Sequence, residues 1–168
     1  MSLQTAATHS IRTFTGKFFD FTVMDPDTIC IEDIAHALAH EPRFSGHTAD
    51  SYSVAKHSLA ACIMAPEEYK LEALLHDAPE AWMKDIAKPL KSLLPDYCAI
   101  ENRLAGVVAH VFKLQHPLPA CIKEIDKDLL KMEYQGLFDE RPYAYLLKHG
   151  PDEVKLLFLE MYEKYKRV

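Results

Sequence analysis

The stretch "EALLHDAPEAWMKDI" (residues 72–86) concentrates side chains that could bind a metal ion. His76 and Asp77 are adjacent, and Glu80 and Asp85 follow in the same stretch. On a helix, Glu80 would lie on the same face as His76 and Asp77, because residues three and four apart are neighbours. Imidazole suits transition metals, and several carboxylates favour the harder divalent ions, magnesium included. The pattern predicts a divalent-cation site; the alternative is a charged helix face with one histidine.

Two side chains elsewhere in the chain could complete this site. His57 lies in "SVAKHSL" between small and apolar residues, so we expect its ring to face inward. Asp126 lies at the edge of an apolar stripe in "ACIKEIDKDLLKME", where a carboxylate without a partner would be costly. Each residue alone has an ordinary explanation, such as a hydrogen-bonded core histidine or a solvated carboxylate. Their joint order favours a metal site, with Asp128 close enough to Asp126 to compete as the last ligand.

The elements that must position these residues are mostly helices. The stretch 14–31 is rich in aromatic and β-branched residues and predicts a short hairpin or an extended arm. Apolar residues at helical spacing, with prolines at several starts, predict helices over 31–40, 51–64, 66–77, 95–112, 119–138 and 151–168. Pro79 cannot lie inside an unbroken helix, so we expect a break near Asp77 and a new turn that carries Glu80 and Asp85. The expected fold class is all-α.

Composition limits the possible functions and locations of this chain. Its 168 residues favour one domain that spans residues 1–168. The net charge of −6 disfavours binding to nucleic acid or to an anionic membrane. Four scattered cysteines without a C-x-x-C pair are typical of a reduced cytoplasmic protein. We find neither an apolar run of about 20 residues nor a signal-peptide core, so a cytoplasmic location is expected.

The ordered set His57, His76–Asp77 and Asp126 resembles the H…HD…D signature of the HD-domain phosphohydrolase superfamily. The resemblance covers about residues 14–133. It is nearest to small bacterial and phage proteins of the 5'-deoxynucleotidase type and their deoxynucleoside triphosphohydrolase relatives. The matching strings are "EDIAHALAHEPRFSGHT", "YSVAKHSL", "LLHDAPEAWMKDIAKPLK" and "EIDKDLLKME". The resemblance implies a helical HD-domain bundle.

The same resemblance implies roles for individual residues. His57, His76, Asp77 and Asp126 would hold one divalent ion, which could be manganese, cobalt, iron, nickel, zinc or magnesium. Glu80 and Asp85 would lie beside the scissile phosphate and serve in proton transfer, water positioning or binding of a second ion. Arg43, the arginine before the first histidine of the signature, would bind phosphate.

Further substrate contacts are expected around this set. Lys91 and Lys88 could hold additional phosphates, although solvated lysines beside Pro89 explain them equally well. Lys88 stands where an "RPLK"-like string would have arginine, so the bidentate fork of arginine is lost there. His47 could contact substrate or only hydrogen-bond within its loop, and Phe44 could stack on a base or ribose.

The expected function is metal-dependent hydrolysis of nucleotides, either (deoxy)nucleoside 5'-monophosphates or deoxynucleoside triphosphates. One alternative is an HD hydrolase of another phosphoester, such as a cyclic nucleotide, an alarmone or a sugar phosphate. A second is a non-enzymatic HD-scaffold adaptor, which the complete signature disfavours. The resemblance also implies a homo-oligomer, a dimer or higher. The aromatic-rich arm or the C-terminal helix could form its interface, although packing within the chain explains these residues equally well: Phe14, Phe18, Phe19 and Phe21 on the arm, and Leu156, Phe158 and Met161 on the helix.

Overall fold

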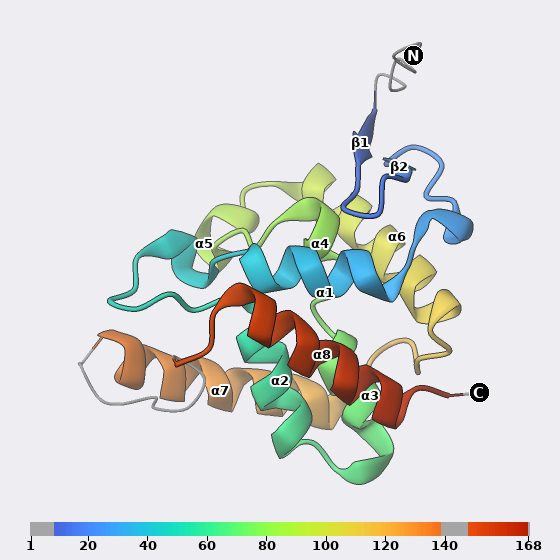
Figure 1. Cartoon of the computed structure of the whole chain (residues 1–168). Helices are drawn as coiled ribbons and strands as arrows, with labels where there is room; N and C mark the ends of the chain where they lie inside the picture. The colour runs from blue at the N-terminus through green and yellow to red at the C-terminus, as the bar shows by residue number, and fades with distance from the viewer. Residues whose placement is uncertain (1–8, 139–147, 168) are drawn as a thin grey trace.

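Helices dominate the computed structural model, which describes residues 9–138 and 148–167 (Figure 1). This confirms the predicted mainly α fold. The predicted single domain extends to residues 1 and 168, which lie outside the described residues. No helix of the described chain is long and apolar enough to cross a membrane. The helices are α1 (Ile31–His40), α2 (Val54–Met64), α3 (Lys70–Leu75), α4 (Glu80–Met83), α5 (Lys88–Lys91), α6 (Pro95–Val111), α7 (Ala120–Phe138) and α8 (Pro151–Tyr165).

A short antiparallel hairpin precedes the helices, as predicted, but it begins earlier than expected. Strand β1 (Ser10–Arg12) pairs with β2 (Phe18–Asp20), so β1 lies before the predicted stretch 14–31. Phe14 belongs to the connecting turn, which Gly16 closes with a φ of 90°. Glycine adopts this left-handed conformation without steric cost, which explains a turn where aromatic residues indicated strand. Phe19 of β2 is buried and its ring lies 5.1 Å from Trp82, so the hairpin packs on α4.

Helix α2 lies at the centre of the bundle and is buried on nearly all sides. It packs against α1, α3, α7 and α8 (Figure 1). Most of its residues are small or apolar, and all of them from Val54 to Cys62 are buried, Lys56 and His57 included, which is typical of a core helix. Ser53 caps its start, because the hydroxyl accepts a hydrogen bond from the Lys56 amide at 3.3 Å. The predicted inward orientation of His57 is confirmed, since its side chain is 0% exposed.

The predicted break at Pro79 is present and separates α3 from α4. Helix α3 ends at Leu75, and the tight turn that follows has hydrogen bonds from Ala78 N to Leu75 O and from Glu80 N to Asp77 O. Pro79 is the N-cap of α4. His76 and Asp77 therefore lie in the turn, where the two side chains can converge, and Glu80 begins the next helix.

Candidate metal centre

Two imidazole rings meet at the centre of the bundle. His57 Nε2, from α2, lies 3.2 Å from His76 Nε2, from the turn after α3. Asp126 Oδ1, from α7, is 3.1 Å from His57 Nε2. Asp77 Oδ2 is 3.1 Å from His76 Nε2 and 3.7 Å from His57 Nε2. The structure thus brings together all four residues that the sequence predicts as ligands.

Hydrogen bonds on the far side of each ring turn both Nε2 atoms toward this cluster. His57 Nδ1 donates to Glu133 Oε1 at 2.5 Å, and His76 Nδ1 donates to the Ala73 carbonyl at 2.7 Å. A carbonyl oxygen and an ionised carboxylate can only accept, so the Nδ1 atoms must carry the protons. Each Nε2 is left to face the cluster, which is the arrangement that metal-binding histidines adopt.

The electrostatics of the cluster fit a cation. Burial lowers the pKa of His57, but hydrogen bonds to Asp126 and Glu133 outweigh this and raise it to about 9. Burial raises the pKa of Asp77, yet His76, His57 and Arg43 hold it below its usual range. The His57 hydrogen bond does the same for Asp126. These ionised carboxylates attract positive charge to Nε2, and a divalent ion can replace the proton there.

The structure distinguishes between the two aspartates that compete as the last ligand. Asp126 points to His57, whereas Asp128 is exposed and pairs with Lys131 at 2.9 Å. His57, His76 and Asp126 each offer a ligand atom, and these atoms lie within 4.8 Å of one another. Two imidazole nitrogens with carboxylate oxygens fit a transition-metal ion such as manganese, iron, cobalt, nickel or zinc.

Arg43 lies beside the cluster, and its predicted role in binding phosphate stays a prediction. Its Nη1 is 3.5 Å from Asp77 Oδ2, and its Nη2 is 3.2 Å from Glu133 Oε2. Burial lowers the pKa of Arg43, but the carboxylates of Glu133 and Asp77 outweigh this and raise it. Phe44 has a φ of 55°, and its ring centroid lies 5.6 Å from the Arg43 guanidinium carbon. Strained backbone of this kind clusters at functional sites.

A polar cavity of about 200 Å³ opens beside the cluster, and its walls include Glu80 and Lys91. Glu80 Oε2 is buried and has no hydrogen-bond partner among the described residues. Burial, with the nearby charges of Asp77 and Asp85, raises the pKa of Glu80 to about 10. Burial is also the main cause that raises the pKa of Asp85. Lys91 Nζ donates to Glu101 Oε1 at 2.5 Å, which limits its freedom to meet another anion.

Four of the five predicted substrate residues do not line this cavity, namely Arg43, Phe44, His47 and Lys88. Lys88 is exposed on α5, and His47 is exposed at the end of the turn that carries Arg43 and Phe44. Their predicted substrate contacts stay predictions. Lys91, by contrast, is partly buried and lines the cavity with Glu80.

Similarity to known proteins defines the family of this chain. The uncharacterized protein YfdR of Escherichia coli (strain K12) is 39% identical over 127 residues, which cover 76% of this chain and 71% of YfdR. The chain belongs to the YfdR family. The uncharacterized protein RCAP_rcc00048 of Rhodobacter capsulatus is 38% identical over 126 residues, or 69% of this chain and 64% of that protein. No family model matches the chain.

In this member of the YfdR family, three residues that were not predicted from the sequence support the site: Glu133, Tyr52 and Glu41. Glu133 is 0% exposed, and its Oε1 also accepts a hydrogen bond from the Tyr52 hydroxyl at 2.7 Å. Glu41 accepts from Lys84 Nζ at 2.7 Å and from the Asp85 amide at 3.4 Å, which positions the segment after α4. A signal existed for Glu133, because it follows Asp126 by two helical turns on one face. Tyr52 and Glu41 have no comparable local signal.

Proposed function

We propose that the protein is a metal-dependent phosphohydrolase of the HD-domain type that acts on nucleotides. One observation supports this above all others. Two imidazoles, anchored through Nδ1, direct their Nε2 atoms at one point together with Asp77 and Asp126. A polar cavity with a buried carboxyl group and a lysine opens beside that point. This combination suits a site that binds a phosphate ester next to a metal ion and hydrolyses it.

The divalent ion would be held by His57, His76, Asp77 and Asp126. The carboxylates of Glu80 and Asp85 could serve as ligands of a second ion. A bound ion supplies Lewis acidity and lowers the pKa of a coordinated water. Arg43 and Lys91 offset the negative charge of the phosphoryl oxygens. Glu80 lines the polar cavity, and its buried Oε2 has no hydrogen-bond partner among the described residues, so the carboxyl group would exchange a proton with water or the leaving oxygen.

The proposed substrates are (deoxy)nucleoside 5'-monophosphates or deoxynucleoside triphosphates, and the proposed location is the cytoplasm. All four cysteines are free thiols, which supports a reducing compartment. The protein would also form a homo-oligomer. Leu156 on α8 is 60% exposed and offers apolar surface for such an interface.

The decisive experiment measures metal content and phosphate release together. Protein loaded with manganese or cobalt should release orthophosphate from nucleoside monophosphates, or triphosphate from deoxynucleoside triphosphates. His76→Ala should lose both the metal and turnover, because it removes a ligand. Glu80→Gln should retain the metal and lower kcat roughly 100-fold or more, because proton transfer is impaired.

His110→Ala is the matched control, since His110 is an exposed histidine on α6. It should behave as the wild type in both measurements. Full turnover by metal-free His76→Ala protein would contradict the proposed chemistry. Normal turnover by Glu80→Gln would show that Glu80 takes no part in the proposed chemistry.

A further inference from the structure

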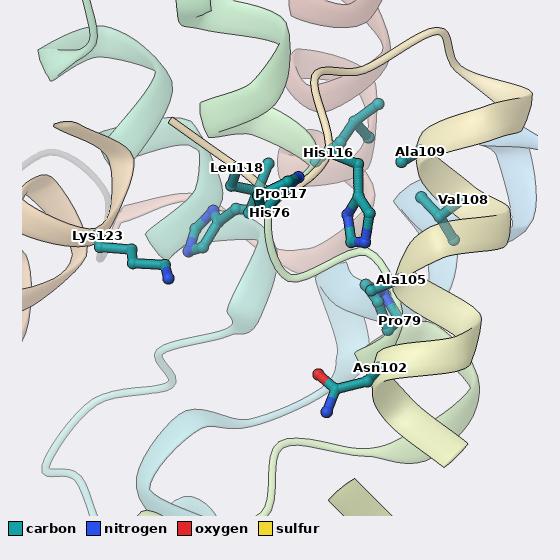
Figure 2. A pocket seen from close by; sticks show the side chains of 11 residues that line it. His76, Pro79, Asn102, Ala105, Val108, Ala109, His116, Pro117, Leu118 and Lys123 are labelled. Atoms are coloured by element: carbon teal, nitrogen blue, oxygen red, sulfur yellow. The ribbon is translucent and has the colours of Figure 1, made fainter. Parts of the chain in front are cut away.

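A second cavity, of about 230 Å³, adjoins the metal centre on the side of α6 (Figure 2). It shares four wall residues with the polar cavity, namely His76, Pro79, Asn102 and Ala105. His76 is the important one, because its Nε2 also belongs to the metal cluster. A molecule in the second cavity would therefore lie beside the point at which the ligands converge.

The two cavities differ in chemistry. The polar one is lined by Asp77, Glu80 and Lys91, whereas the second has walls of Leu75 and of Val108 and Ala109 from α6. Pockets that bind small organic molecules typically have mostly apolar walls and a few polar groups, as the second cavity does.

Polar groups reach the second cavity from three elements (Figure 2). Asn102 comes from α6, His116 from the segment between α6 and α7, and Lys123 from α7. The ring of His116 lies along α6 near Gly106, where an added Cβ would lie 4.0 Å from His116 Nε2. An amide offers both a donor and an acceptor, and an imidazole ring can stack on a base.

The segment that carries His116 is held in place from behind. The Gln115 amide donates to Glu72 Oε1 at 3.0 Å, and Glu72 is 0% exposed on α3. The same oxygen lies 2.7 Å from Arg167 Nη2. This wall is therefore preformed, and a ligand would not have to order it on binding.

We propose that the second cavity holds the base and sugar of the nucleotide while its phosphate lies at the metal centre, an inference that rests on the proposed function. Ligand pockets usually enclose about 300–1,000 Å³, so each cavity alone is small and the two joined reach that range. The polar cavity suits the phosphate. The second suits a flat, largely apolar ring with polar edges facing Asn102 and His116. A phosphoester without such a ring would leave the second cavity unfilled.

The first test fills the second cavity without touching the polar one. Ala109→Leu should lower kcat/KM for deoxyadenosine and thymidine 5'-monophosphates by at least about tenfold, because the added side chain occupies the space for the base. Glycerol 3-phosphate has neither a base nor a ribose ring, so its kcat/KM should stay within about twofold. Ala99→Leu is the matched control on an exposed position of α6 and should change neither. Equal loss for both substrate classes would overturn the proposal.

A second measurement does not depend on turnover or on the tolerance of Ala109. His116 and His110 are both exposed and can be modified by diethyl pyrocarbonate. Deoxyadenosine 5'-monophosphate should slow modification of His116 severalfold and leave His110 unaffected, whereas orthophosphate should protect neither. Protection without phosphate release from any substrate would refute the hydrolase and keep the nucleotide site. Hydrolysis without protection of His116 would refute the nucleotide site and keep the hydrolase.

Discussion

At the scale of single residues, Glu133 determines how His57 can act. Its carboxylate accepts hydrogen bonds from His57 Nδ1 and from the Tyr52 hydroxyl, and Arg43 Nη2 lies 3.2 Å from its other oxygen. Burial raises the pKa of Glu133, but the His57 hydrogen bond and charge outweigh this and lower it. An ionised Glu133 therefore keeps a proton on Nδ1 and holds Nε2 toward the cluster, where a divalent ion would replace the proton on Nε2. A group that accepts a hydrogen bond from a metal-binding histidine, as Glu133 does from His57, tunes the affinity of the site for metal.

We predict that Glu133→Gln weakens the affinity for a divalent ion by about 10- to 100-fold, because the neutral amide no longer holds His57 as strongly. Competition with a chromogenic chelator measures this affinity. Asp128→Asn, on the exposed face of α7, is the control and should bind metal as the wild type does. An unchanged affinity in Glu133→Gln would assign Glu133 a structural role only.

At the scale of elements, Asp33 joins the hairpin to α1. The Thr15 amide and hydroxyl donate to its two carboxylate oxygens at 2.7 and 2.9 Å, and the Cys30 thiol donates at 3.1 Å. Burial raises the pKa of Asp33, but these hydrogen bonds outweigh it and leave the pKa below its usual value. Helix α1 packs on α4, which begins at Glu80, so this junction supports the site indirectly.

We predict that Asp33→Asn lowers the free energy of unfolding at pH 7 by about 1–3 kcal/mol, because hydrogen bonds to a charged acceptor are lost. The lowered folded-state pKa means that the ionised form stabilises the fold. This contribution is complete above the unfolded-state pKa of about 3.9 and is lost as the pH falls through the folded-state value. The difference from wild type should therefore shrink between pH 7 and pH 3 in urea unfolding.

Glu32→Gln is the control for this prediction, because Glu32 is the exposed neighbour of Asp33 on α1. It should leave unfolding unchanged at both pH values. A difference between Asp33→Asn and wild type that stays equal at pH 7 and pH 3 would show that the charge of Asp33 is not the cause.

At the scale of the whole molecule, the C-terminal end closes the bundle. Helix α8 packs on α1, α2 and α3 (Figure 1). Arg167 Nη2 reaches the buried Glu72 at 2.7 Å, and its Nη1 donates to the Lys113 carbonyl at 2.6 Å. One side chain thus connects α3, the segment after α6 and the end of the chain.

We predict that Arg167→Ala destabilises the fold by about 1–3 kcal/mol, because it leaves the buried Glu72 carboxylate without its charged partner; the partial exposure of Arg167 moderates the cost. Thermal and urea unfolding measure the loss of stability.

Adding Glu72→Gln to Arg167→Ala should recover part of this loss, because the uncompensated charge is then gone. Lys166→Ala removes an exposed neighbour and serves as the control. Equal stability of Arg167→Ala and Lys166→Ala would contradict this role.

The helices could be predicted well because their signals are local. The spacing of Ile31, Ile34 and Leu38 indicates a helix over 31–40, which is α1, and the break at Pro79 follows from the geometry of one ring. The predicted hairpin is present, but it begins before residue 14, because Phe14 and Gly16 form its turn, where Gly16 has a positive φ, and Phe18 and Phe19 form its second strand. Such a conformation depends on packing that sequence periodicity does not report.

The sequence by itself determined which residue types could form the site and which helices would carry them, because helical spacing and proline geometry operate over a few residues. Only the tertiary structure decided that Asp126, not Asp128, meets His57, and that Glu133 lies behind the ring. It also decided that Lys91 lines the polar cavity while Lys88 remains exposed. The first two outcomes depend on how α7 packs against α2, and the third depends on how α5 packs against α6; such packing between helices involves residues far apart in the sequence.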